Sequence, residues 1–182
     1  MKTSKYSAPL IVFIISVCIL VICYPGFMSY DSIRMLEEAR TSVRGGIYPT
    51  MPVYILRVFD IFGHGSTLML QIQNYTLLLG LMLILRTLGA SLIASMVSLL
   101  GLLLFPTVIG CMLVLWKDVT LTALMVCSVA LIYWASQVEK NTRYLNLAKW
   151  LSLLLLVLGT LVRFRVVWML LFFLCGTLRD VG

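Results

Sequence analysis

The chain has 182 residues, of which 62% are hydrophobic and 12% are charged, and its mean hydropathy is +1.06. A soluble domain of this length has no interior large enough to bury so much apolar surface. The composition therefore excludes a soluble globular protein and predicts lipid as the surrounding solvent. The formal net charge of +7 comes from Lys and Arg residues that stand singly or in pairs between apolar runs. This distribution is typical of the ends of membrane spans and argues against nucleic acid as a partner.

Apolar runs long enough to approach the thickness of a bilayer predict a polytopic all-α bundle with about six spans, forming a single transmembrane domain over 1–182. Lys2 and Lys5 precede the first run, and no small-x-small cleavage site follows it. We therefore expect an uncleaved anchor with a cytoplasmic N-terminus. The basic residues of the whole chain, these two lysines included, divide evenly between the two sides, so the predicted orientation depends on the position of the lysines at the N-terminus. The predicted spans lie near 8–23, 67–85, 91–115, 119–135, 148–162 and 166–178.

The polar segment 25–66, between the first two spans, is expected to be an outer loop. Its apolar residues recur at helical spacing in two stretches, the second of which covers about 52–62. Two short amphipathic helices lying in the membrane interface account for this pattern. The apolar positions are Ile33, Leu36, Ala39 and Val43 in the first stretch, and Val53, Leu56 and Ile61 in the second.

The cysteines give no sign of a metal centre or of a disulfide framework. All five lie within or beside apolar runs, and none belongs to a CxxC pair or a Cys/His cluster. We expect them to be packing residues. The sequence indicates neither a metal nor a cofactor. The five are Cys18, Cys23, Cys111, Cys127 and Cys175.

Charged residues at three span ends are the candidate functional positions, because charge near hydrocarbon is costly. Asp31 follows the first span; a simple alternative is that it is the N-cap of a helix starting near Ser32. Lys117-Asp118 lies between two apolar runs, where it could be an interfacial ion pair. Arg163 and Arg165 lie between two later runs, where they could form the turn of a helical hairpin.

Six spans with a cytoplasmic N-terminus would place all three charged positions on the outer side. A carboxylate, an ammonium and guanidinium groups that converge there suit a reaction that expels a phosphate. The carboxylate would take a proton from an acceptor hydroxyl, and the cations would hold the leaving group.

The order of short motifs along about 25–165 resembles the bacterial multi-span glycosyltransferases of the GT-C architecture, which use polyprenyl-phosphate sugars and include the protein mannosyltransferase-like group. The similarity corresponds to the N-terminal part of such enzymes, which usually have more spans. It is carried by PGF-x-x-x-DS and the helix after it (Pro25 to Arg40), Tyr48-Pro49, Leu56-Arg57, Gln71, Phe105-Pro106, Trp116-Lys117-Asp118 and Arg163.

The resemblance implies roles for particular residues. Asp31 would be the catalytic base, and Lys117, Arg163 and Arg165 would bind the donor phosphate, with Asp118 and Tyr48 in support. The implied partners are a polyprenyl-phosphate sugar lipid, the bilayer of the bacterial inner membrane and, as a further candidate, a second membrane chain. No metal and no cofactor are implied.

Two other functions remain open from the sequence. The chain could be a non-catalytic membrane partner, or a degenerate remnant of such an enzyme, in which case the charged sites would tolerate alanine. A small transporter is the third choice, since it would need polar residues in mid-span. Apart from Gln71, Gln73 and Asn74, the mid-span positions are nearly free of amides.

Overall fold

Apolar helices make up most of the fold, which confirms the all-α class. The computed structural model describes residues 7–41, 50–63, 65–138 and 142–162, and within these ranges eight α-helices and two very short strands follow one another. Both expected helices of the segment after α1 are present, as α2 and α3. The elements are α1 Ser7–Ile22, β1 Phe27–Met28, α2 Tyr30–Thr41, α3 Thr50–Asp60, α4 Gly65–Thr87, α5 Leu92–Leu103, α6 Pro106–Leu113, β2 Val114–Leu115, α7 Lys117–Val138 and α8 Thr142–Val162.

The expected number of six spans is not confirmed within the described residues. Among the described residues, three helices are long and apolar enough to cross a membrane, in α4, α7 and α8. The helix α1 is apolar but has 16 residues, which gives a length of about 24 Å against the roughly 30 Å of hydrocarbon in a bilayer. The predicted span 166–178 lies outside the described residues. The structure therefore supports three spans, or four if α5 and α6 count as one.

The predicted single span 91–115 is wrong in its shape. It consists of α5 and α6, which meet at an angle of 84°. The break lies at Phe105-Pro106, where Phe105 is extended and Pro106 opens the second helix. A proline disfavours the helical conformation of the residue before it and has no N–H to donate, so a continuous helix cannot pass this point without distortion.

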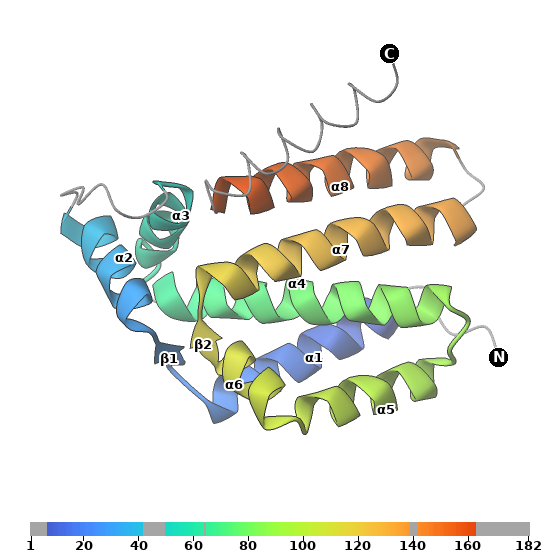
Figure 1. Cartoon of the computed structure of the whole chain (residues 1–182), viewed down its shortest axis with the longest axis horizontal. Helices are drawn as coiled ribbons and strands as arrows, with labels where there is room; N and C mark the ends of the chain where they lie inside the picture. The colour runs from blue at the N-terminus through green and yellow to red at the C-terminus, as the bar shows by residue number, and fades with distance from the viewer. Residues whose placement is uncertain (1–6, 42–49, 64, 139–141, 163–182) are drawn as a thin grey trace, which may run out of the picture.

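The helix α4 lies at the centre of the arrangement, between α1 and α7, and α8 packs on the far side of α7 (Figure 1). The helices α2 and α3 lie across the end of the bundle at which α4 begins. At its other end, α4 stops in a Schellman motif at Gly89, whose φ is +89°. This turn reverses the chain into α5, which Ser91 caps by accepting the N–H of Ala94.

Small residues set the helix contacts within the bundle. Gly80 of α4 lies directly against the backbone of Cys127 on α7. On the opposite side of α7, the buried hydroxyls of Ser128 and Ser152 contact each other at 2.7 Å, and each also bonds to the other residue's carbonyl. These contacts hold α4, α7 and α8 close together, as expected for helices that associate in lipid.

A separate apolar cluster lies under the end of the bundle that carries α2 and α3. Its buried members come from α2, α3, α4 and β2, so it joins segments that are far apart in the sequence. This cluster is the support on which the candidate site is built. Its members are Met35, Ala39, Leu56, Met69, Leu70 and Leu115.

Candidate functional site

A parallel pair of strands brings two distant parts of the chain together. Phe27 pairs with Val114 and Met28 with Leu115, so β1 and β2 run side by side. Each strand is followed, after one residue, by a helix: α2 begins at Tyr30 and α7 at Lys117. The N-termini of two helices therefore lie next to each other, and both carry the positive end of a helix dipole.

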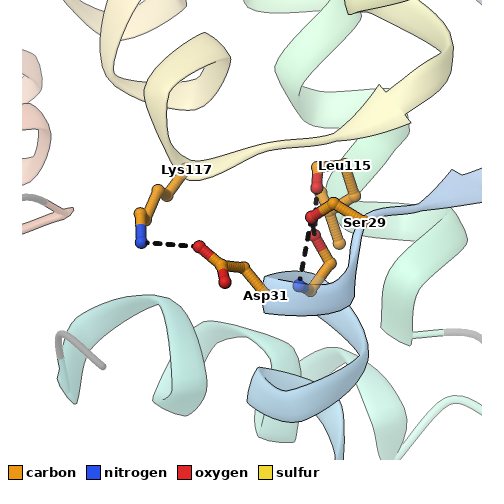
Figure 2. Close-up of polar contacts among 5 residues, drawn as sticks. Ser29, Asp31, Leu115 and Lys117 are labelled. Atoms are coloured by element: carbon orange, nitrogen blue, oxygen red, sulfur yellow. Dashed lines mark hydrogen bonds and ion pairs between the residues drawn. The ribbon is translucent and has the colours of Figure 1, made fainter. Parts of the chain in front are cut away.

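The N-cap of α2 is Ser29, so the alternative that Asp31 is the cap of this helix is wrong. The Oγ of Ser29 accepts the N–H of Ser32 at 3.2 Å and also contacts the Ser32 hydroxyl at 2.8 Å. The Ser32 hydroxyl in turn donates to the carbonyl of Leu115 on β2 (Figure 2). Because Ser29 satisfies the end of the helix, the side chain of Asp31 is available for another contact.

That contact is an ion pair with Lys117. The Nζ of Lys117 lies 3.0 Å from Oδ2 of Asp31, although the two residues are 86 positions apart in the chain (Figure 2). The lysine side chain is 24% exposed and the aspartate side chain 45%. Both groups are therefore open to an incoming molecule, and solvent limits the pair's contribution to stability to about 1 kcal/mol or less.

Asp118 belongs to the same end of the bundle. Continuing the register of the strand pair, Asp118 takes the same place at the start of α7 that Asp31 takes at the start of α2. It is exposed, and its carbonyl accepts the hydroxyl of Thr122. Two carboxylates and one ammonium therefore come from the first turns of two adjacent helices.

Gln73 of α4 holds the segment that carries Lys117. Its side chain is 1% exposed and reaches both sides of this segment. Its Nε2 donates to the carbonyl of Val114 at 3.2 Å, and its Oε1 accepts the hydroxyl of Thr120 at 2.9 Å. Since Val114 precedes Lys117 and Thr120 follows it by one helical turn, the glutamine fixes the position from which Lys117 extends.

The turn before Asp31 also packs on α4. Thr67 donates its hydroxyl to the carbonyl of Pro25 at 3.2 Å. Gly26 has a φ of +93°, which L-residues rarely adopt, and a Cβ at this position would lie 2.5 Å from the Leu70 side chain. One helix thus supports both halves of the ion pair.

The helices α2 and α3 are joined by a two-point ion pair, at the end of α2 opposite to Asp31. Arg40 donates from Nε and Nη2 to the two carboxylate oxygens of Asp60, at 2.8 and 2.9 Å. The hydrogen bonds from Arg40 hold the pKa of Asp60 below its usual value. This pair fixes α3 against α2.

The predicted site residues divide into two groups. Asp31, Lys117 and Asp118 lie together at one end of the bundle, as the sequence analysis expected of them. Tyr48, Arg163 and Arg165 lie outside the described residues. The catalytic and phosphate-binding roles assigned to these residues remain predictions.

Three residues of the site were not singled out from the sequence as site residues: Ser29, Ser32 and Gln73. The first two had a recognisable signal, because a serine followed by a helical pattern is a common N-cap. The sequence signal at Gln73 was weaker: an amide side chain is rare within an apolar span.

Comparison with known proteins finds no match: no protein-family model fits the chain, and no curated protein or solved structure is significantly similar to it.

Proposed function

We propose that the chain is a membrane-embedded glycosyltransferase of the GT-C type, or the N-terminal part of one. It would transfer a sugar from a polyprenyl phosphate to a hydroxyl acceptor at the outer face of a bacterial inner membrane. The observation that supports this proposal best is the contact between Asp31 and Lys117, which unites a partly exposed carboxylate and ammonium at two helix N-termini.

In this mechanism Asp31 is the base. Its carboxylate removes the proton of the acceptor hydroxyl, whose oxygen then attacks the anomeric carbon of the sugar. The bond between that carbon and the phosphate oxygen breaks, and the phosphate leaves with the electron pair. Lys117 and the first N–H groups of α7 face the developing negative charge, with Arg163 and Arg165 as further cations.

The ion pair has a specific place in this scheme. Without substrate, Asp31 and Lys117 neutralise each other. A phosphate that binds Lys117 competes with Asp31 for the ammonium, and this competition leaves the carboxylate free to accept a proton from the hydroxyl. Donor binding would therefore prepare the base.

Lipid mass spectrometry of the purified protein tests the donor site. Wild type should carry a polyprenyl phosphate or its sugar conjugate, and Lys117→Gln and Arg163→Ala should lose it. Lys149→Gln is the matched control, because Lys149 is an exposed lysine on α8. Asp31→Asn should keep the lipid but fail to transfer sugar. Unchanged transfer by Asp31→Asn would refute the mechanism.

A second candidate is a non-catalytic membrane subunit. The observation that favours it is that Asp31 and Lys117 already satisfy each other, an arrangement that also serves simply to join α2 to α7. This candidate predicts only bulk phospholipid in every sample and a second membrane chain that co-purifies. It also predicts that reversing the pair, as Asp31→Lys with Lys117→Asp, preserves the protein's function.

A further inference from the structure

The helix α4 carries a buried amide that has no partner in the part of the chain that the structure describes. The side chain of Asn74 is completely buried, and neither its Oδ1 nor its Nδ2 has a hydrogen-bond partner among the described residues. The same is true of the Oε1 of Gln71. Unpaired amide groups are costly in any interior and more so at membrane depth, where no bulk water reaches them.

These orphan atoms lie on one side of α4. Residues three apart on a helix are neighbours on its surface, so Gln71 and Asn74 are adjacent. Gln71 is already fixed by its other atom, since its Nε2 donates to the hydroxyl of Ser16 at 2.9 Å. That hydroxyl donates to the carbonyl of Phe13 at 2.8 Å. Gln71 is thus the α4 end of a series of hydrogen bonds that links α1 to α4, and Asn74 lies beside it on the helix surface.

The site lies inside the bundle. At a rise of about 1.5 Å per residue, Gln71 and Asn74 are about 9 to 14 Å along α4 from its first residue. Apolar residues flank the two amides on α4: Leu70, before Gln71, is 2% exposed, and Leu78, one turn after Asn74, is 0% exposed. The orphan atoms are themselves closed to solvent. A place that is closed to solvent excludes a lipid head group or a sugar.

The chemistry of the three atoms specifies the ligand. Two of them, Oδ1 of Asn74 and Oε1 of Gln71, accept hydrogen bonds, and one, Nδ2 of Asn74, donates. Water supplies two donors and at least one acceptor, and buried waters in proteins typically make three hydrogen bonds. We propose that Gln71 and Asn74 form a binding site for an ordered water molecule that joins α1 to α4. This site is independent of the proposed glycosyl transfer.

Water-edited solid-state NMR in lipid bilayers tests the proposal on the wild-type protein. With asparagine labelled by ¹⁵N, the side-chain amide of Asn74 is assigned by its loss in Asn74→Leu. Magnetisation from water should reach this amide as quickly as it reaches the exposed Asn146. It should not reach the methyl groups of Leu78, which are equally buried one turn further along. If the Asn74 amide is as slow as Leu78, the site is dry and the proposal fails.

Two variants test whether Gln71 shares the water. Gln71→Leu removes one acceptor, and the water signal at Asn74 should be lost. Ile72→Leu, on the lipid-exposed neighbouring position, is the matched control and should leave the signal unchanged. A signal that persists in Gln71→Leu would mean that Asn74 is hydrated by another route, which would overturn the two-amide site.

Discussion

The close approach of α4 to α7 at Gly80 predicts that a single methyl group here weakens the fold. A Cβ at Gly80 would lie 2.8 Å from the backbone nitrogen of Cys127 and 2.9 Å from its Cα, whereas ordinary contacts begin at 3.4 Å. Gly80→Ala therefore requires the two helices to separate by about 0.6 Å. The atoms in the way belong to the backbone and cannot rotate aside.

The size of the effect follows from two opposing terms. Overpacking of this kind costs about 1–3 kcal/mol, while alanine gains up to about 1 kcal/mol over glycine in helix propensity. We expect Gly80→Ala to lose about 1–2 kcal/mol of unfolding free energy. The matched control is Gly110→Ala on α6, where no atom lies within 4 Å of the added Cβ. This variant should be neutral or gain up to about 1 kcal/mol.

Thermal unfolding in detergent compares the two variants directly. A difference of about 2 kcal/mol corresponds to roughly 4–8 °C in Tm for a chain of this length. Adding Cys127→Ala to Gly80→Ala should not restore stability, because the obstruction is the backbone of residue 127. The argument is refuted if Gly80→Ala melts at or above the temperature of Gly110→Ala. Rescue by Cys127→Ala would instead identify the thiol as the obstacle.

Three further predictions concern the ion pair between α2 and α3, the contact between α7 and α8, and the turn before Asp31. Asp60→Asn should lower the unfolding free energy at pH 7. Because Arg40 depresses the pKa of Asp60, the contribution of this ion pair is complete above the usual aspartate pKa of about 3.9 and disappears as the pH falls through the lower folded value. Ser128→Ala and Ser152→Ala should each cost about 0.6–1.7 kcal/mol in SDS unfolding. The double variant should cost nearly the sum, since each hydroxyl donates to a backbone carbonyl that the other substitution leaves in place. Gly26→Ala should cost about 1–2 kcal/mol in thermal unfolding because its φ is +93°.

Each of these predictions has a control and a contradicting outcome. Glu37→Gln removes a more exposed ion pair and should change stability less than Asp60→Asn; equal losses would contradict the special role of the two-point contact. A double variant of Ser128 and Ser152 that costs little more than one single variant would contradict this and would identify the shared contact between the two hydroxyls as the main one. Gly63→Ala has a similar positive φ but open space around it, so Gly26→Ala should cost more; the reverse order would exclude a role for the close Leu70 side chain.

The apolar runs predicted the long helices well, because hydropathy reports where lipid is the solvent. The runs 67–85 and 119–135 correspond to α4 and α7, each of which extends further at both ends. Hydropathy gives no information on the direction of a helix axis, so the break at Phe105-Pro106 could not be recognised within a continuous apolar run. The proline was the available signal, and its effect on the preceding residue gives the physical reason for the break.

The site was predictable as a set of residues but not as an arrangement. The cost of charge near hydrocarbon identified Asp31 and Lys117 from the sequence. Their contact depends on β1 and β2, which have two residues each and leave no alternating pattern to recognise. The N-cap depends on where α2 starts. Because the helix begins two residues earlier than the capping alternative for Asp31 requires, Ser29 is the cap and Asp31 is a partner of Lys117.

The position of Lys117 follows from two contacts made by the same helix. Gln73 of α4 bonds on both sides of Lys117, and Gly80, two turns further along α4, lies against the backbone of α7. A rigid helix held at two separated points can neither slide nor rotate freely, so α7 presents Lys117 in one direction. The polar contact lies at the end of the bundle that carries Asp31, and the steric contact lies deeper. Replacing Gly80 with a larger residue should push α4 and α7 apart, and it should therefore weaken the ion pair between Asp31 and Lys117 as well as the packing of the bundle. The candidate site thus depends on α4.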